Sequence, residues 1–366
     1  MDKIKRFIEC LVPGTACNLN CSYCYEAQRG RKKGDLPNFR YSPEHIGRAL
    51  SKDRLGGICY ISICGEGETL LSPEMPEIIR CILQQGHYVN ITTNGTLKER
   101  FDEIIASLTR EELERLHFAF SFHYLELARL RKIEDFFENV RKIKNVGCSF
   151  VVQFNLCDEY LPYLEEIKTL CEKNVGAPPQ VFPTRDERGK KITLMTKYSL
   201  NEYKKFGEMF NSPIFRFNMK NFMVKRKEFC YAGDWSFVLR LDTGIMKKCY
   251  SSPYKQDIFK NPDKPIRFRA VGNNCNSPYC INSSHFLALG VIPKLSVPSY
   301  ASLRNRPEAQ WYTPRMKAFL NTKLVESNQE YSLFLKMKAN VEEFTLCLIK
   351  KIILKIKKYL YFFHAF

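Results

Sequence analysis

Three cysteines near the start of the chain have the residue type and spacing of a metal site. Cys17, Cys21 and Cys24 place three thiolates within eight residues, and thiolates are good ligands for iron–sulfur clusters and for zinc. A structural zinc site takes four ligands and would want a fourth cysteine or histidine nearby. Three thiolates on a four-iron cluster leave one iron open. The spacing therefore favours an iron–sulfur cluster that takes part in chemistry.

Four later cysteines could hold a second metal centre. Cys230 is followed by thirteen residues, Gly244, four more residues and Cys249, and Cys275 and Cys280 come afterwards. The glycine permits a tight turn between two short strands, so we expect Cys230 and Cys249 to flank a β-hairpin. A zinc ion and a second iron–sulfur cluster are both compatible with four thiolates.

Expected strands and helices that could position these cysteines alternate along residues 6–183. Short apolar runs with strand character are separated by longer amphipathic stretches, and such alternation predicts a parallel sheet. Six repeats are too few to close an eight-unit barrel. The predicted fold class is therefore α/β, a partial (β/α)6 TIM-like barrel. The strands that we expect are Arg6–Val12, Ile58–Ile63, Tyr88–Thr92, His117–Ser121, Ser149–Asn155 and Gln180–Pro183, and the helices are Pro43–Lys52, Met75–Gln85, Leu97–Leu108, Lys132–Asn145 and Leu161–Asn174.

A chemically distinctive segment follows each expected strand. The cysteine loop follows the first, Gly-Glu-Gly-Glu-Thr at 65–69 follows the second, and Thr-Thr-Asn-Gly at 92–95 follows the third. Ligands of parallel α/β folds bind at the carboxyl ends of the strands, so these segments should meet at one site. The side chains that we expect there from the last three strands are Ser121, His123, Gln153, Asn155, Thr184 and Arg185.

The first cysteine loop, with Tyr23 just before its last cysteine and a strand in front of it, resembles the radical S-adenosylmethionine (SAM) superfamily. The resemblance covers residues 8 to about 185. It implies that a catalytic 4Fe-4S cluster on Cys17, Cys21 and Cys24 chelates SAM through its open iron. It also implies that reductive cleavage of SAM, by an external reductant such as flavodoxin or ferredoxin, gives a 5′-deoxyadenosyl radical that abstracts hydrogen from a substrate.

The same resemblance assigns the contacts to SAM. The segment 65–68 resembles the Gly-Gly-Glu motif of the family, whose carboxylate accepts hydrogen bonds from the SAM ammonium. We expect Glu68 in this role because Thr69-Leu70-Leu71 follows it in the family's register, but Glu66 stands where the family has glycine, so the choice between the two carboxylates stays open. A turn-forming Asn94 and a buried Ser121 are the alternatives to SAM contacts by these residues. The other residues that the resemblance implies at the cofactor are Tyr23, Gly67, Asn94, Ser121, Asn155 and Arg185.

The segment from Cys230 to Cys249 resembles the N-terminal part of the SPASM and twitch auxiliary-cluster domains, and Cys-Tyr-Ala-Gly at 230–233 fits the usual sequence pattern of these domains. A complete SPASM domain has more cysteines, enough for two clusters. The resemblance therefore implies the shorter twitch form, with one auxiliary 4Fe-4S cluster on Cys230, Cys249, Cys275 and Cys280. We expect a barrel over residues 1–215, an auxiliary-cluster domain of a β-hairpin and helix over 225–292, and a helical C-terminal extension over 293–366.

The end of the chain predicts a basic amphipathic helix over residues 346–363. Its five lysines argue against a membrane span. Three interpretations remain: the helix packs on the domain with its lysines in water, it makes a peripheral contact with an anionic membrane, or it docks on a partner. At 100° per residue the apolar face carries Ile349, Ile352, Ile353, Ile356, Leu360 and Phe363, and the opposite face carries Lys350, Lys351, Lys355, Lys357 and Lys358.

Composition narrows the function. The 57 basic and 39 acidic residues give a net charge of +18, which suits acidic partners, but the positive charge is dispersed and accompanies no basic–aromatic motif of a nucleic-acid-binding module. The N-terminus lacks the apolar core of a secretory signal, and the chain has fifteen cysteines, so we expect a reducing, cytoplasmic location.

We therefore expect a radical SAM enzyme that oxidises or epimerises a small molecule of the sugar or aminocyclitol kind. A peptide maturase is the alternative, although the sixteen residues before Cys17 leave no room for the N-terminal peptide-recognition domain that such maturases often have. A non-enzymatic, basic metal protein that binds nucleic acid is the third hypothesis.

Overall fold

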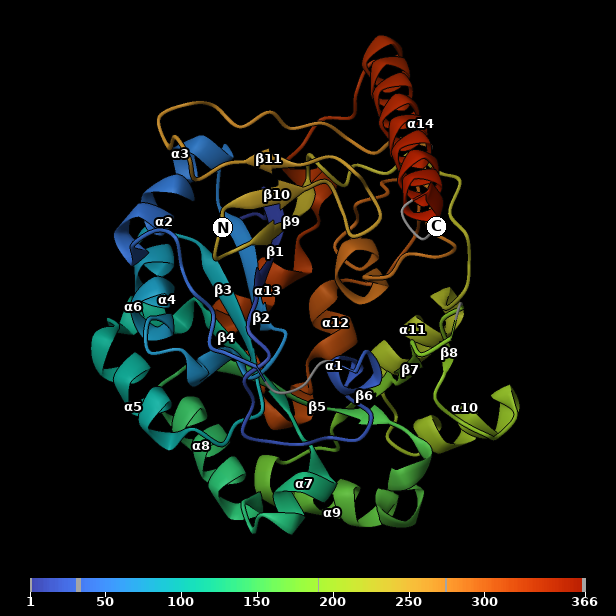
Figure 1. Ribbon diagram of the computed structural model, residues 1–366. Coiled ribbons are helices and arrows are strands. Elements are labelled where there is room, and N and C mark those ends of the chain that lie inside the picture. The colour runs from blue at the N-terminus through green and yellow to red at the C-terminus, as the bar shows by residue number, and fades with distance from the viewer. Residues whose placement is uncertain (1, 31–33, 190, 274, 364–366) are drawn as a thin grey trace.

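A nine-stranded sheet organises the chain (Figure 1), in the order β11-β10-β9-β1-β2-β3-β4-β5-β6. The computed structural model describes residues 2–30, 34–189, 191–273 and 275–363, with side chains of the last helix described up to residue 356. Strands β1 to β6 are all parallel, as the α/β prediction requires. Their bounds are β1 Arg6–Val12, β2 Cys59–Gly65, β3 Tyr88–Thr93, β4 Leu116–Ser121, β5 Ser149–Leu156 and β6 Gln180–Pro183.

Helices cover the outer face of this sheet. The predicted helix Pro43–Lys52 is two helices, because the chain breaks at Leu50 and restarts after Ser51. On α4, Ile78, Ile79 and Ile82 are fully buried against the sheet. The helices of the barrel are α1 Tyr25–Gln28, α2 Pro43–Ala49, α3 Lys52–Leu55, α4 Met75–Gln84, α5 Lys98–Ser107, α6 Arg110–Glu114, α7 Tyr124–Arg129, α8 Ile133–Asn145, α9 Leu164–Val175, α10 Leu200–Glu208 and α11 Pro213–Asn221, with the 3-10 turns η1 Thr69–Leu71 and η2 Asp158–Tyr163.

The C-terminal third of the chain fills the lower part of the barrel interior. Tyr88 stacks on Phe319 with ring centroids 3.6 Å apart, and Tyr60 contacts Tyr300 at 5.4 Å. These tyrosines lie on the inner face of β2 and β3, near the amino ends of the strands. The elements involved are the π-helix η3 Ser283–Leu287, α12 Tyr300–Arg304, α13 Pro314–Asn321 and the 3-10 turns η4 Pro307–Ala309 and η5 Leu324–Glu326. The polar residues at the carboxyl ends of the strands therefore face the other end of the barrel interior.

The hairpin that carries the later cysteines extends the barrel sheet. Strand β9, Ser236–Arg240, pairs in parallel with β1, and β10, Ile245–Lys247, pairs antiparallel with β9. Gly244 turns the hairpin with φ +73°, and a β-carbon there would lie 2.4 Å from Phe259 Cβ. The remaining strands are β11 Gln256–Asp257 and the separate pair β7 Arg185–Asp186 and β8 Thr193–Leu194.

The last helix, α14, spans Leu333–Phe363 and projects away from the barrel (Figure 1). Of the predicted amphipathic face, the side chains of Lys357, Lys358, Leu360 and Phe363 lie outside the described residues. None of the described helices combines the length and the apolar content that a membrane crossing needs.

Candidate functional site

Two loops at the carboxyl ends of β1 and β2 are joined through their backbones. The amide of Glu66 donates to the Val12 carbonyl at 3.0 Å, that of Gly67 to Gly14 at 2.7 Å, and that of Glu68 to Ala16 at 2.9 Å. A β-carbon on Gly67 would lie 2.0 Å from the Ala16 carbonyl oxygen. The glycine is therefore required for the close approach that holds the cysteine loop in place.

The loop after β1 gathers Cys17, Cys21 and Cys24, all partly accessible. Burial, followed by the neighbouring Cys17 and Cys24 charges, raises the pKa of Cys21. Thiolates of a tetrahedral zinc site lie about 3.8 Å apart, given Zn–S bonds of about 2.3 Å. In the described chain, no three of its cysteine sulfurs lie within 4.8 Å of one another. Three thiols on one loop are the donor set that a 4Fe-4S cluster with one open iron would take.

Tyr23 supports this loop from behind. Its side chain is buried, and its hydroxyl forms hydrogen bonds with His123 Nδ1 at 2.5 Å and with the Tyr160 hydroxyl at 3.0 Å. Burial raises the pKa of Tyr23 and lowers the pKa of His123 to about 4, so the pair is neutral near pH 7. The structure thus brings Tyr23 and His123 together as a positioning pair.

The two candidate carboxylates have different surroundings. Glu68 is buried, and its Oε1 accepts from the Leu70 amide at 3.1 Å and the Thr93 hydroxyl at 2.6 Å, while Oε2 accepts from the Asn94 amide at 2.8 Å. A carboxylate offers about four lone-pair sites, so Oε2 can accept one more donor. The more accessible Glu66 approaches Arg240 at 3.9 Å. Burial raises the pKa of Glu68, and the three hydrogen bonds oppose that rise.

Asn94 ties the end of β3 to the cysteine loop. Its Nδ2 donates to Asn18 Oδ1 at 2.7 Å, and its Oδ1 accepts from the Thr96 amide and hydroxyl at 3.1 and 2.7 Å. Asn18 in turn donates to the Thr96 hydroxyl at 2.7 Å. Gly95 completes the turn with φ +73°. These contacts show Asn94 as a turn-forming residue, and they include Asn18 and Thr96, which the sequence analysis did not select.

Polar side chains on the inner face of β4 and β5 lack protein partners. Ser121 pairs with Gln153 in the sheet register, and Asn155 lies two residues further along the same face. Gln153 Oε1 is buried without a hydrogen bond, and within the described residues neither the Ser121 hydroxyl nor the Asn155 amide has a side-chain hydrogen bond. Buried polar groups are normally satisfied. Unused donors and acceptors at strand ends are what a polar ligand would require.

Arg185 lies between the two sets of cysteines. Its guanidinium forms an ion pair with Glu187 at 3.0 Å, donates to the Ile281 carbonyl at 3.4 Å and lies 5.5 Å from the centre of the Tyr25 ring. Tyr25 directly follows Cys24, and Ile281 directly follows Cys280. The structure therefore places Arg185 at the junction of the two cysteine regions, with its charge balanced by Glu187.

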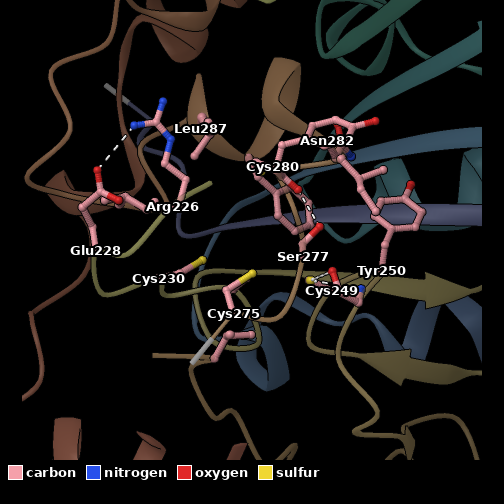
Figure 2. Close-up of a pocket in the computed structure, with 17 residues that line it drawn as sticks. Arg226, Glu228, Cys230, Cys249, Tyr250, Cys275, Ser277, Cys280, Asn282 and Leu287 are labelled. Carbon is pink, nitrogen blue, oxygen red and sulfur yellow. Dashed lines mark hydrogen bonds and ion pairs between the residues drawn. The ribbon is translucent and has the colours of Figure 1, made fainter. Parts of the chain in front are cut away.

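The four later cysteines line a single cavity (Figure 2). Cys230 forms a β-bridge with Gly272, Cys249 follows β10, and Cys275 and Cys280 belong to the loop before η3. Burial raises the pKa of Cys230, and the other three thiols raise it further. The four sulfurs are also more widely spaced than a mononuclear zinc site requires. The cavity therefore fits a cluster with four thiolate ligands.

A buried acid inside the barrel was missed by the sequence analysis. Glu9 on β1 is 5% exposed, its Oε2 accepts from Asn282 Nδ2 at 3.1 Å, and burial raises its pKa to about 7. Arg304 is also buried, donates to the Ser284 carbonyl at 3.2 Å and has an Nε without a partner. A glutamate between the apolar residues Ile8 and Cys10 of β1 was the available signal.

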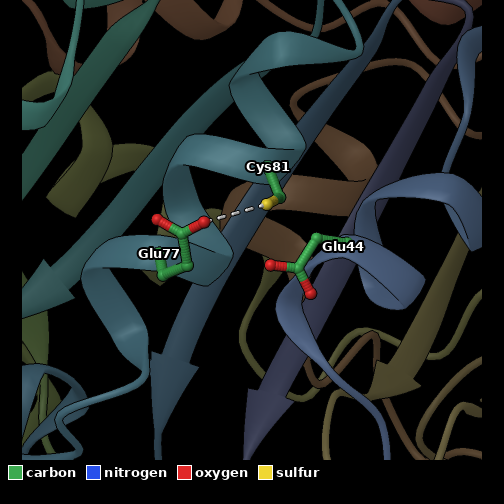
Figure 3. A group of neighbouring side chains, drawn as sticks. All are labelled: Glu44, Glu77 and Cys81. Carbon is green, nitrogen blue, oxygen red and sulfur yellow. Dashed lines mark hydrogen bonds between the residues drawn. The ribbon is translucent and has the colours of Figure 1, made fainter.

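A third group of possible ligands lies on the outer surface. Glu44, Glu77 and Cys81 come together on α2 and α4 (Figure 3). Both carboxylate oxygens of Glu77 accept from Arg80, and Cys81 donates to Glu77 at 3.7 Å. The arrangement is a salt-bridged helix surface.

Comparison with known proteins finds a matching family for the first five strands of the barrel. A family model described as the radical SAM superfamily matches residues 11–157. Residues 11–157 of this chain are therefore similar to the radical SAM superfamily. The matched range contains Cys17, Cys21, Cys24 and Glu68 and ends before the later cysteines. The superfamily implies an enzyme that uses a 4Fe-4S cluster and SAM, which agrees with the thiols and strand ends described above.

One relative in sequence and one solved structure are similar to this chain. A probable GTP 3′,8-cyclase of Pyrobaculum aerophilum is 33% identical over 103 residues, which are 27% of this chain and 31% of that protein. The fold resembles SuiB of Streptococcus suis, with TM-score 0.51, 14% identity and coverage of 71% of this chain and 64% of SuiB. SuiB bound to S-adenosylmethionine gives TM-score 0.50 at 15% identity, covering 70% and 64%. The chain thus spans about a third of the curated relative's length and under two thirds of SuiB, and the structural likeness shows the fold.

Proposed function

We propose that this chain cleaves SAM reductively and uses the resulting 5′-deoxyadenosyl radical to abstract hydrogen from a substrate. The observation that carries the proposal is the set of three thiols on a loop joined to the Glu68 loop, beside unpartnered polar side chains. A 4Fe-4S cluster with one open iron would supply the electron for SAM cleavage. Cys17, Cys21 and Cys24 would hold it.

The chain's own residues would bind and orient SAM. The remaining acceptor site on Glu68 Oε2 suits the SAM ammonium, a charge-assisted hydrogen bond, and this favours Glu68 over Glu66. The unused groups of Ser121 and Asn155 suit the ribose or carboxylate of SAM. Tyr23 and Gly67 act by positioning the loop, and Arg185 would act beside it while its guanidinium is ion-paired with Glu187.

We propose an auxiliary 4Fe-4S cluster on Cys230, Cys249, Cys275 and Cys280. Four thiolates complete its ligand set, so its task would be electron transfer or shaping of the pocket. Tyr250 supports this placement, because it follows Cys249 and lines the cavity, and because burial and then the nearby Glu9 charge raise its pKa. The second cluster would therefore border the interior that contains Glu9.

For the substrate we propose a small polar molecule, oxidised or epimerised after hydrogen abstraction. Glu9, Asn282 and Arg304 are grouped inside the barrel, and Arg304 Nε lacks a partner. Such groups suit a compact ligand with several hydroxyl or amino groups. A flavodoxin or ferredoxin in a reducing, cytoplasmic compartment would supply the electron. The alternative is a peptide substrate, and hydrogen abstraction from a peptide would replace the small-molecule proposal.

Metal analysis tests the clusters. After anaerobic reconstitution we expect about eight iron and eight sulfide per chain, falling to about four of each when Cys17, Cys21 and Cys24 are replaced by alanine. The variant Cys275→Ala/Cys280→Ala should also lose one cluster while keeping the first. Cys81→Ala, a cysteine outside both groups, is the matched control and should keep the full content. Zinc without sulfide at either group would refute that cluster.

SAM cleavage tests the activity. On reduction, the reconstituted protein should release 5′-deoxyadenosine, and the triple cysteine variant should release none. Deuterium from a labelled sugar or aminocyclitol should appear in the 5′-deoxyadenosine if the substrate class is right. Transfer from a peptide instead would indicate a maturase, and absence of cleavage in protein with intact clusters would refute the proposed function.

A further inference from the structure

Helix α14 presents an unusual apolar face to solvent. Met337, Val341 and Phe344 are 68%, 65% and 59% exposed, and at 100° per residue they share one face with Leu348 and Ile352, which are also exposed. We call these five residues the α14 stripe. Soluble surfaces carry single exposed apolar side chains, whereas a continuous row marks an interaction surface.

The root of α14 is fixed so that the stripe points outward. Opposite the stripe, Glu343 is buried and forms an ion pair with Lys248 at 3.0 Å, and the Lys248 side chain is itself fully buried. The Ser252 hydroxyl donates to Glu343 at 3.2 Å, and the Asn273 amide donates to Asn340 at 2.8 Å. Rolling the helix to cover the stripe would leave a buried lysine without its partner, which is strongly unfavourable.

The exposed charge on the outer half of α14 is positive. Lys350, Lys351 and Lys355 are exposed, and the sequence contains no aspartate or glutamate after Glu343. Glu342 faces Lys248, Arg267 and Arg269 at 3.6 to 4.0 Å, so it does not offset these lysines.

We propose that α14 binds an anionic membrane surface in the plane of the interface. The α14 stripe would enter the boundary between headgroups and acyl chains, and the lysines would contact lipid phosphates, as in interfacial amphipathic helices. A second copy of this chain fits less well. Two parallel stripes would bring Lys351 and Lys355 of each copy together, with no carboxylate beyond Glu343 to compensate. This inference does not depend on the proposed function.

Vesicle sedimentation with the full-length protein tests the proposal. We expect binding to phosphatidylcholine vesicles containing 30% phosphatidylglycerol, little binding to pure phosphatidylcholine, and a loss of binding at high salt. Lys351→Glu/Lys355→Glu should weaken the affinity by at least about 30-fold, since both lysines lie beside the α14 stripe and each lysine near a membrane contributes about fivefold. Lys204→Glu/Lys205→Glu, an exposed pair on α10 with the same charge change, is the matched control and should bind normally.

A second variant reports insertion of the stripe directly. Leu348→Trp should show a blue-shifted tryptophan emission with the anionic vesicles and none with the neutral ones. Equal binding to both vesicle types, or undiminished binding by the Lys351/Lys355 variant, would overturn the proposal. A stable dimer in light scattering that Val341→Asp/Leu348→Asp dissociates would also overturn it, in favour of a second copy.

Discussion

Replacing Gly67 by alanine should separate the two loops that form the site. The new β-carbon would lie 2.0 Å from the Ala16 carbonyl oxygen and 2.9 Å from that of Gly14. Both obstacles are backbone atoms, so relief requires one loop to move by more than about 1 Å, which breaks the hydrogen bonds between them. Those three bonds have lengths of 2.7 to 3.0 Å.

The cost follows from these contacts. Each lost backbone hydrogen bond contributes about 1 kcal/mol, and forcing extra volume into a packed site costs about 1–3 kcal/mol. The sum is about 4–6 kcal/mol, comparable with the whole stability of many domains. If the outer parts of the barrel stay folded, the strain falls on the cysteine loop. Gly67→Ala should then keep its secondary structure and lose the first cluster.

Iron and sulfide content after reconstitution, measured beside circular dichroism, gives the result. We expect about half the iron of the parent protein, as for loss of one of two clusters. Gly189→Ala is the matched control, because its nearest neighbour would lie 3.6 Å away. Parent-like iron content and SAM cleavage in Gly67→Ala would show that the two loops are not held as closely as the structure has them.

Three further results are expected. Glu68→Gln should weaken SAM binding about 10- to 100-fold, from the loss of a hydrogen bond to a charged group, whereas Glu66→Gln should leave it unchanged in calorimetry; an equal loss of SAM affinity in both variants would leave open which of the two carboxylates binds SAM. Asn155→Ala should reduce SAM affinity without lowering the melting temperature, whereas Asn94→Ala should destabilise the protein by about 1–3 kcal/mol because its partners lose their bonds; the reverse pattern would contradict the site. Glu9 has a folded pKa raised from 4.5 to about 7, so its folded state binds more protons and stability falls as pH rises across that interval. Glu9→Gln should remove this slope and add about 3 kcal/mol at pH 8 in denaturant titrations; an unchanged slope would show that Glu9 ionises normally.

The local pattern of the chain predicted the barrel strands closely. β1 and β6 begin and end where the apolar runs predicted, because continuous Val, Ile, Leu and Phe runs are typical of strands buried on both faces. The break between α2 and α3 was missed, since the hydrophobic period continues across Ser51. The approach of the Glu68 loop to the cysteine loop was predicted only as a meeting of strand ends.

Long-range packing left no comparable trace in the sequence. The pairing of β9 with β1 joins residues more than 200 positions apart, and no local periodicity encodes it. The filling of the interior by residues 283–324 depends on the same kind of contact. The interaction of Asn94 with Asn18 and the burial of Glu9 opposite Asn282 likewise require the folded chain. A polar residue between two apolar neighbours was a usable signal for Glu9 alone.

The parallel pairing of β9 with β1 has a consequence for dividing this chain. A shortened chain that stopped near residue 220 would leave β1 as an open edge, with free amide and carbonyl groups ready to pair with another molecule. It would also lack the side chains that fill the barrel from below. The barrel is therefore not a detachable module. The loop after β1 and the later cysteines near β9 and β10 are attached to one continuous sheet, so the sheet and not a hinge sets the distance between the two cysteine regions.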